Sequence, residues 1–218
     1  MARKPADQAV NRDDIIRAAA EVLRRSGYEH TTMKDIAAEV NLTAASLYHH
    51  FRNKDALLLA VLEGGLDYVI DKLERIAGSS RPNSDKLRQM IGLHVISVAD
   101  NPAVGAAFVF GIRVLVGGKE PPGNGGQAER VSADEFVRRR EKHFARRDYF
   151  EKLYRDVVQA GIDEGEFRAV DAAIFTRAML GAHNWVGVWY RESGRLGGDE
   201  IADIMADTFA IELLINTC

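Results

Sequence analysis

Apolar residues recur every three or four positions through most of this 218-residue chain, which places them along one side of an α-helix. The segment 84–100 is a clear case, and its apolar face carries Leu87, Met90, Ile91, Val95 and Val98. The alternating β-branched runs typical of strands are scarce, and only five prolines interrupt the helical pattern. The sequence therefore predicts an all-α protein with about nine helices.

The N-terminal quarter of the chain predicts three helices in close succession. The first spans about residues 11–26 and ends at Gly27, the second spans 33–40, and the third spans 44–50. A three-residue turn separates the two short helices. Because a support helix followed by two short helices across such a turn is the layout of a DNA-reading helix-turn-helix, we predict that unit here.

Capping residues support these helix boundaries. Thr32 is followed three positions later by Asp35, an arrangement close to a capping box, and Thr43 can cap the next helix. Leu47 and Phe51 lie four positions apart and are predicted to pack inward together. Each threonine therefore has a structural role available besides any contact with DNA.

The rest of the chain predicts six longer helices, at residues 53–77, 84–100, 103–116, 132–160, 171–192 and 199–216. Segment 103–116 is almost uncharged, so we expect it to be buried, whereas 117–127 is rich in Gly and is predicted to be a flexible loop. We predict two domains, a helix-turn-helix domain at residues 1–54 and a larger helical domain at 55–218.

The charge of the chain is distributed unevenly. The net charge of −3, taken alone, argues against a nucleic-acid partner. Residues 1–54, however, hold 9 Lys and Arg against 7 Asp and Glu, whereas the remainder is acidic. This asymmetry favours the N-terminal quarter as the part that meets phosphate. The excess of positive charge there is small, which disfavours a non-specific architectural DNA-binding protein.

Residues 11–62 resemble the DNA-binding domain of the TetR family of transcriptional regulators. The features that carry the resemblance are Thr31-Thr32, Ile36-Ala37, Leu47-Tyr48-x-His50-Phe51 and Asn53-Lys54-Asp55-x-Leu57-Leu58, in that order. The resemblance implies a DNA-binding head on a larger helical domain that binds an effector and dimerises. It also implies operator double-stranded DNA as the partner.

The predicted DNA contacts follow the family's pattern and are Thr32, Lys34, Thr43, Ala44, Ala45, Ser46, Tyr48, His49, His50 and Lys54. Thr32 and Lys34 stand at a predicted helix N-terminus, where free N–H groups favour phosphate. Tyr48 has an alternative position in the core. The adjacent histidines are not predicted to bind metal, because neighbouring positions diverge on a helix and no further ligand has suitable spacing.

The last two predicted helices are the candidates for dimerisation, since helix-turn-helix proteins usually bind two-fold DNA sites as dimers. The predicted interface residues are Phe175, Met179, Trp189, Ile204, Met205 and Phe209. In the family the corresponding helices pair with those of a second copy as a four-helix bundle. The alternative is that these residues complete the core of a single chain.

Residues 181–203 are similar to an acyl-CoA-responsive branch of the TetR family, which implies a hydrophobic or acyl-CoA-like small-molecule effector. The apolar residues predicted to line its site are Phe108, Phe110, Val114, Phe144 and Trp185. The basic run from Arg138 to Arg147 is a candidate for binding CoA phosphates, but its interleaved acidic residues are also typical of a solvated helix face. No cofactor and no metal are predicted.

Two other functions are weighed against a ligand-responsive repressor, namely an enzyme acting on a CoA ester and a regulator with an activator role. The sequence has no Gly-x-Ser-x-Gly elbow and no P-loop, which disfavours the enzyme. The single cysteine, Cys218, excludes an intrachain disulfide, and no apolar stretch is long enough to span a membrane. We therefore expect a cytoplasmic protein without a membrane partner. The homodimer is expected from the helix-turn-helix and from the family resemblance.

Overall fold

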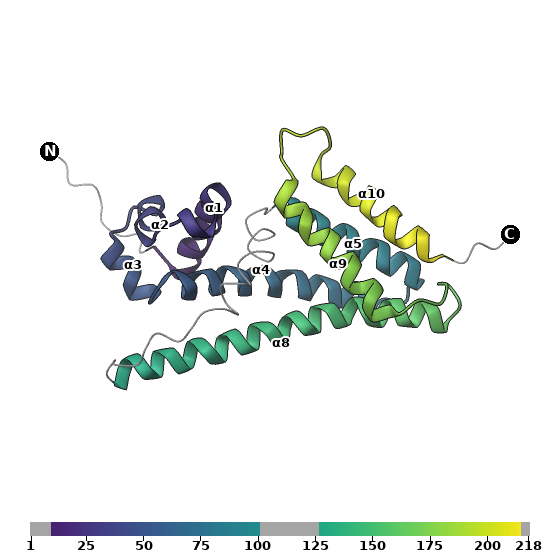
Figure 1. Cartoon of the computed structure of the whole chain (residues 1–218), viewed down its shortest axis with the longest axis horizontal. Helices are drawn as coiled ribbons and strands as arrows, with labels where there is room; N and C mark the ends of the chain where they lie inside the picture. Colours follow the sequence, from purple (N-terminus) through teal and green to yellow (C-terminus); the bar gives the residue numbers. More distant parts are fainter. Residues whose placement is uncertain (1–9, 101–126, 215–218) are drawn as a thin grey trace.

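The computed structural model describes residues 10–100 and 127–214, and these residues are almost entirely helical (Figure 1). The helices are α1 Arg12–His30, α2 Met33–Glu39, α3 Ala44–His50, α4 Lys54–Ala77, α5 Asn83–Asp100, α8 Gln127–Asp163, α9 Ala172–Trp189 and α10 Gly198–Ala210, followed by a 3₁₀ turn, Ile211–Leu213. A single isolated antiparallel bridge, between Phe167 and Leu214, is the β contact found in the described part. The prediction of an all-α fold is confirmed.

Local capping sets the boundaries of the three N-terminal helices. Asn11, Thr32 and Thr43 are the N-caps of α1, α2 and α3, and each side chain accepts a hydrogen bond from a backbone N–H of its helix. Gly27 has a φ of 70°, in the left-handed region that glycine adopts readily, and it kinks α1 at the predicted end of the first helix. The turn after α2 contains Asn41 with a φ of 56°, a conformation that asparagine tolerates.

Helix α4 connects the two ends of the molecule. Its first turns, Leu57–Leu62, are buried together with α1, α2 and α3 in one apolar cluster, which we call the N-terminal core. Its later residues Leu66, Ile70 and Leu73 are buried in a second cluster with α5, α8, α9 and α10, the C-terminal core. Figure 1 shows α8 running beside α4 over much of its length.

Long-range hydrogen bonds hold α5 in the C-terminal core. The phenol of the buried Tyr154 on α8 donates to the carbonyl of Met90 at 2.8 Å. The carboxylate of Glu166, between α8 and α9, accepts from the backbone N–H groups of Asn83 at 2.8 Å and Ser84 at 2.9 Å, so it caps α5 from a distant part of the sequence. Burial works against the charged form of Glu166, but these hydrogen bonds leave its pKa below the ordinary value.

The observed helix bounds differ from the predicted ones mainly in the C-terminal half. Helix α8 extends beyond the predicted 132–160 at both ends, and it begins at Gln127, which we predicted to lie in a loop. Helix α10 ends before the predicted residue 216, because the chain tightens into the 3₁₀ turn that buries Leu213. The predicted helix 103–116 and the predicted loop residues 117–126 lie outside the described residues. Among the described helices, none is both long and apolar enough to cross a membrane.

Candidate functional site

The outer face of α3, the predicted DNA-reading helix, is open to solvent. Tyr48 is 53% exposed, and the neighbouring His49 and His50 are exposed as well. Leu47 and Phe51, in contrast, are buried in the N-terminal core, as their spacing predicts. The alternative that Tyr48 is a core aromatic is therefore wrong, and its ring is accessible to a partner.

The first turn of α3 combines a cap with small side chains. The Thr43 hydroxyl oxygen accepts from the Ser46 N–H at 3.1 Å, and the two hydroxyl oxygens lie 2.9 Å apart. Ala44 is half-buried and Ala45 is exposed, and each offers only a methyl group. The polar side-chain atoms in this first turn of α3 are therefore the two hydroxyls, which a base edge or a phosphate would have to share with the cap.

The start of α2 is capped in the same way. The hydroxyl of Thr32 donates to the carboxylate of Asp35 at 2.7 Å, and its backbone N–H donates to the same carboxylate at 2.9 Å. These hydrogen bonds lower the pKa of Asp35. Because the Thr32 side chain is already engaged, the exposed Lys34 is the better placed of the two for a contact with phosphate.

Lys54, which we predicted to contact the DNA backbone, makes contacts within the protein. Its ammonium group donates to the carbonyl oxygens of Tyr28 at 2.7 Å and Thr31 at 3.0 Å, and it lies 4.0 Å from the centre of the Tyr28 ring. The Tyr28 phenol donates to Asp55, and burial together with this hydrogen bond raises the pKa of Tyr28. Lys54 therefore joins the start of α4 to the end of α1, because free carbonyls at a helix C-terminus attract a cation.

Replacing Lys54 by Met is expected to lower the free energy of unfolding by about 1–3 kcal/mol, since it leaves two partly buried carbonyls without their charged donor. Urea denaturation followed by circular dichroism would measure this loss. Lys34→Met removes an exposed lysine on α2 and serves as the matched control, with unchanged stability expected. Unchanged stability of Lys54→Met together with weakened DNA binding would instead support the phosphate contact that we predicted from the sequence.

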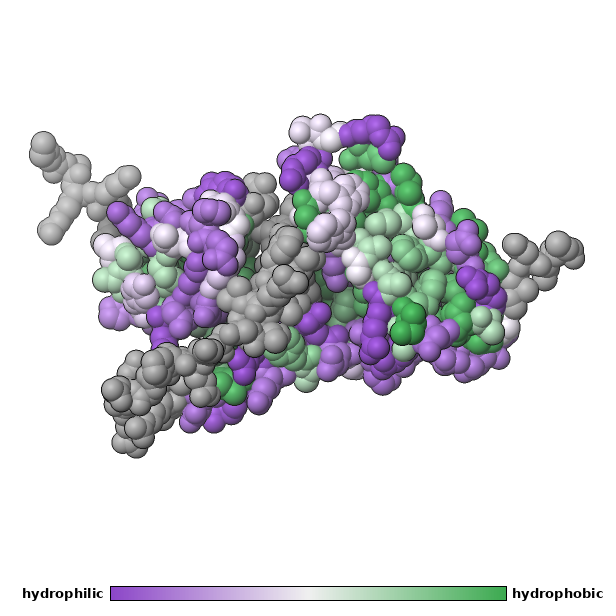
Figure 2. Space-filling view, in the orientation of Figure 1, coloured by the Kyte–Doolittle hydropathy of each residue, from purple (hydrophilic) through white to green (hydrophobic). Residues whose placement is uncertain are grey.

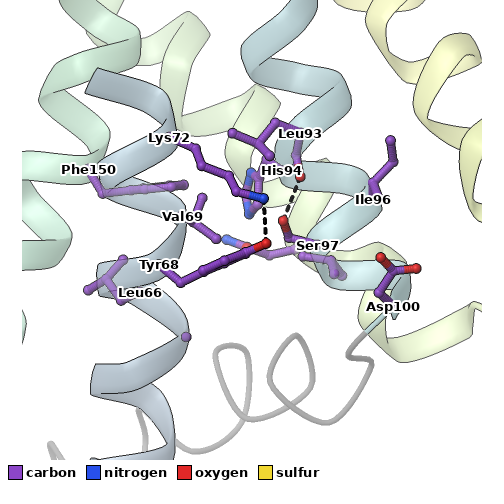
Figure 3. A pocket seen from close by; sticks show the side chains of 13 residues that line it. Leu66, Tyr68, Val69, Lys72, Leu93, His94, Ile96, Ser97, Asp100 and Phe150 are labelled. Atoms are coloured by element: carbon purple, nitrogen blue, oxygen red, sulfur yellow. Dashed lines mark hydrogen bonds between the residues drawn. The ribbon is translucent and has the colours of Figure 1, made fainter. Parts of the chain in front are cut away.

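A cavity of about 310 Å³ lies between α4 and α5 (Figure 3). Leu66 and Val69 of α4 and Phe150 of α8 form part of its apolar wall, and Asn184 of α9 is among its polar lining residues. His94 of α5 is also part of the wall, although it is only 6% exposed. A concave site that combines apolar walls with convergent polar groups is typical of a small-molecule site.

Polar side chains gather near this cavity, as Figure 3 shows. The Lys72 ammonium group donates to the phenol oxygen of Tyr68 and lies 4.1 Å from the centre of that ring. Ser97 donates to the carbonyl of Leu93 at 2.7 Å, and Asp100 also lines the cavity. The site therefore suits a molecule that has an apolar body and a few polar atoms.

Two buried histidines connect the cavity to α9 and α10. The rings of His94 and His183 lie edge to face with their centres 5.6 Å apart, and His183 lies 5.3 Å from the ring of Phe209 in the same manner. On its other side His94 lies 5.1 Å from the ring of Phe150. Burial lowers the pKa of His94 to about 4 and that of His183 well below its ordinary value, so both rings are uncharged at neutral pH.

Neither Phe144 nor Trp185, the two predicted effector-binding residues that the structure describes, is among the described residues that line this cavity. Phe108, Phe110 and Val114 lie outside the described residues. Phe144 packs against the N-terminal core, and Trp185 is 51% exposed on α9. Sequence reasoning missed the cavity residues, although His94 gives a signal, since it is a polar residue at a position on the apolar face of its helix.

The predicted basic run on α8 is used in part to hold α8 against α4. Arg139 pairs with Glu63 at 2.5 Å, and Arg146 pairs with Asp67 at 2.8 Å. A smaller space of about 230 Å³ lies beside these two ion pairs. The arginines therefore contact α4 carboxylates in this structure, and phosphate binding by the run stays a prediction.

An exposed apolar surface covers α9 and α10. Figure 2 shows hydrophobic side chains gathered over these two helices, whereas the surface over α8 is mostly hydrophilic. The large residues of this surface, which we call the dimer face, are Ile174, Trp185, Trp189, Ile204, Ile211 and Leu214, each at least 39% exposed. Large exposed apolar patches of this kind are typical of protein–protein contacts.

The predicted interface residues divide between this surface and the core. Trp189 and Ile204 belong to the dimer face, whereas Phe175, Met205 and Phe209 are half-buried against the C-terminal core. Met179 is fully buried and cannot reach a second chain in this conformation, because the turn of α9 points it toward the core. Ile211 was not predicted, although it follows Ile204 at helical spacing, which is the signal that could have found it.

Two family profiles match the chain, one in each half. Residues 15–61 match the profile described as bacterial regulatory proteins, tetR family. Residues 137–212 match the profile described as tetracyclin repressor-like, C-terminal domain. The first match covers most of α1 through the start of α4, and the second covers most of α8, α9 and α10.

Similar proteins agree with these matches. The HTH-type transcriptional repressor KstR2 of Mycolicibacterium smegmatis is 26% identical over 202 residues, which cover 90% of this chain and 87% of that protein. Among solved structures, KstR2 of Mycobacterium tuberculosis has a TM-score of 0.76 at 21% identity, covering 98% of this chain and 100% of that one. AibR in complex with isovaleryl coenzyme A and operator DNA has a TM-score of 0.69 at 25% identity, covering 90% and 96%. The chain therefore belongs to the TetR family of bacterial regulatory proteins.

Proposed function

We propose that this protein is a transcriptional repressor that binds operator DNA as a homodimer and releases it when a small, largely apolar molecule occupies the cavity. The proposal rests on the observation that α4 contacts both the N-terminal core and the cavity. Its first turns, Leu57–Leu62, belong to the N-terminal core that supports α3, whereas its later residues Leu66 and Val69 line the cavity. One continuous helix thus joins the proposed DNA-binding domain, residues 1–54, to the proposed effector domain, residues 55–218.

The effector acts on DNA binding by favouring one position of α4 over another, because a ligand shifts an equilibrium only through its different affinity for the two states. In this structure α4 is held by ion pairs to α8, such as Arg139 with Glu63, and by Lys54 at its start. A displaced α4 carries the head with it. The distance between the two heads of a dimer then no longer matches half-sites spaced by about 34 Å.

The dimer face supplies the contact between two copies of the chain. Pairing α9 and α10 with their counterparts would cover Ile174, Trp189 and Ile204, which are exposed in the single chain. A two-fold arrangement presents the same surface from both chains, so one apolar patch is sufficient. It also directs two α3 helices toward two half-sites of a palindromic operator.

The related proteins support both the role and the class of effector. KstR2 is named as a repressor, and AibR was crystallised with an acyl-CoA and operator DNA. We propose an acyl-CoA or a related lipid-derived thioester as the effector and the cytoplasm, where operator DNA is found, as the place of action. The relatives are regulators, and we propose no catalytic activity for this chain.

Replacing Tyr48 by Ala tests the DNA-reading face. We expect affinity for the DNA upstream of the protein's own gene to fall about five- to 150-fold at fixed salt concentration, since one good contact at a base or phosphate is worth about 1–3 kcal/mol. Fluorescence anisotropy would measure it. Tyr149→Ala removes another exposed tyrosine, on α8, and should leave the affinity unchanged. Equal binding by wild type and Tyr48→Ala would place the DNA face elsewhere.

Titration of the protein–DNA complex with acyl-CoAs of increasing chain length tests the effector. Release of the DNA is expected, and Val69→Trp, which fills the cavity, should abolish the response to acyl-CoA. Tighter DNA binding on addition of acyl-CoA would instead support a regulator that requires its ligand. Hydrolysis or transfer of the acyl group in the same mixture would contradict a purely regulatory role.

A further inference from the structure

The wall of the cavity contains a buried polar group whose hydrogen-bonding capacity is only partly used. His94 is 6% exposed, and its Nδ1 atom is itself buried and has no hydrogen-bond partner among residues 10–100 and 127–214. A ligand atom therefore reaches Nδ1 when the side chain shifts slightly toward the cavity. The carboxamide of Asn184 on α9 hydrogen-bonds to the same imidazole. A buried polar atom without a partner costs free energy, so its presence beside an apolar cavity calls for an explanation in terms of what the cavity binds.

We propose that the cavity recognises one uncharged polar group of its ligand, a carbonyl or a hydroxyl oxygen set within an apolar body, through Nδ1 of His94, with Asn184 holding the ring in place. This inference rests on the proposed role of the cavity as the effector site. It adds which atom of the protein meets the ligand and which chemical group the ligand must carry.

The surroundings of His94 favour an uncharged partner. The imidazole is neutral at physiological pH, because burial lowers its pKa to about 4, and it therefore offers no positive charge to a carboxylate or phosphate. Phe150 and Leu66 form apolar wall around it, and the nearest ammonium group of the cavity lining, that of Lys72, is engaged by Tyr68. A charged group placed against His94 would lose its hydration without gaining an opposite charge from the ring.

The Asn184 carboxamide also explains why either a carbonyl or a hydroxyl is acceptable. An amide can donate to or accept from an imidazole nitrogen, and a neutral imidazole carries its proton on one nitrogen at a time. When Asn184 donates, Nδ1 carries the proton and can donate to a ligand carbonyl. When Asn184 accepts, Nδ1 presents a lone pair to a ligand hydroxyl.

The position of His94 connects this recognition to the remainder of the effector domain. Its ring contacts Phe150 of α8 and His183 of α9, and His183 in turn contacts Phe209 of α10. A ligand that engages Nδ1 therefore touches the point at which α5, α8 and α9 meet. An apolar ligand of the same shape without the polar group would fill the cavity but leave this point unengaged.

A pair of matched fluorescent probes tests the proposal. The first is prodan, a naphthalene ketone, and the second is its deoxy analogue, in which a methylene replaces the carbonyl. Wild-type protein is expected to bind prodan about tenfold more tightly than the analogue, the equivalent of one hydrogen bond in a buried site. His94→Leu should abolish this preference by weakening prodan binding alone, whereas His94→Gln, which retains a hydrogen-bonding side chain, should keep part of it.

The outcomes separate the two proposals. Equal binding of both probes by the wild type, or an undiminished preference in His94→Leu, would overturn recognition by His94 while leaving the cavity as the effector site. Val69→Trp should block both probes. If it blocks neither, or if neither probe binds the wild type, both proposals are contradicted: the cavity as the effector site and the recognition of a polar group by His94. Asn184→Ala is a second variant, which removes the hydrogen bond that orients the ring. Circular dichroism melting of each variant shows whether loss of binding reflects loss of fold.

Discussion

Lowering the pH from 7 to 5 is expected to reduce the free energy of unfolding by about 5 kcal/mol, which is comparable to the whole stability of many domains. His94, His143 and His183 are buried, and burial lowers the pKa of the first two to about 4 and that of His183 well below its ordinary value. All three stay neutral in the folded protein at pH 5. In the unfolded chain each takes up a proton below pH 6.5, which favours unfolding by nearly 2 kcal/mol per residue at pH 5.

The sign of this effect follows from the direction of the shifts. A histidine whose folded-state pKa is depressed has no effect above the unfolded value of 6.5, and stability is lost as the pH falls from there toward the folded value. Urea denaturation at a series of pH values would show the loss. His183→Leu should remove about one third of it, and at pH 7 this variant should be at least as stable as the wild type, because neither ring nitrogen of His183 has a hydrogen-bond partner among the described residues.

The variant comparison also isolates the histidines from carboxylates that titrate over the same range. Each single replacement, His94→Leu or His183→Leu, should flatten the pH dependence by a similar amount, and the double variant should flatten it further. Identical pH profiles for wild type and double variant would mean that these rings are protonated or hydrated in the folded protein. Acid unfolding would then have to be assigned to other groups.

Replacing Ile204 by Glu is expected to convert the protein from a dimer to a monomer and to lower its affinity for operator DNA by about a hundredfold or more. Ile204 is 51% exposed and belongs to the dimer face, as do Trp189 and Ile211. In a two-fold interface the substitution places two carboxylates in an apolar contact, and burying such charges without partners costs several kcal/mol. A monomer binds one half-site and loses the gain in affinity from the second head.

Sedimentation velocity and fluorescence anisotropy on the same preparation would measure both effects. Ala145→Glu adds the same charge at an exposed position on α8 and should leave the dimer and the DNA affinity unchanged. A dimeric Ile204→Glu protein with full DNA affinity would show that the surface over α9 and α10 does not hold two chains together. A monomer that still binds DNA tightly would show that one head is sufficient.

The DNA-reading head is the part that sequence reasoning described most closely. Its helix boundaries depend on local interactions, such as the Thr32 hydroxyl with Asp35 and the Thr43 hydroxyl with Ser46, and both partners of each interaction lie within a few residues. The inward position of Leu47 follows from helical spacing alone. Gly27 likewise ends the straight part of α1 through its own backbone conformation.

The cavity and the role of Lys54 illustrate what the sequence could not specify. Lys54 is a surface lysine by its sequence context, and only the packing of α4 against the end of α1 brings its ammonium group to the carbonyls of Tyr28 and Thr31. The partners of His94 come from α8 and α9, far away in the chain. Periodicity shows that a residue faces a core, but it does not show which residues it meets there.

The sequence by itself therefore determined the all-α class, the capped helices of the head and the exposed reading face, because these depend on interactions within one or two helical turns. Only the tertiary structure decided that the cavity lies between α4 and α5, that Met179 is buried while Ile174 and Ile204 are exposed, and that Lys54 fastens α4 to α1. Each of these depends on the angle and register at which helices distant in sequence pack, and such packing is set by the whole set of side chains between them.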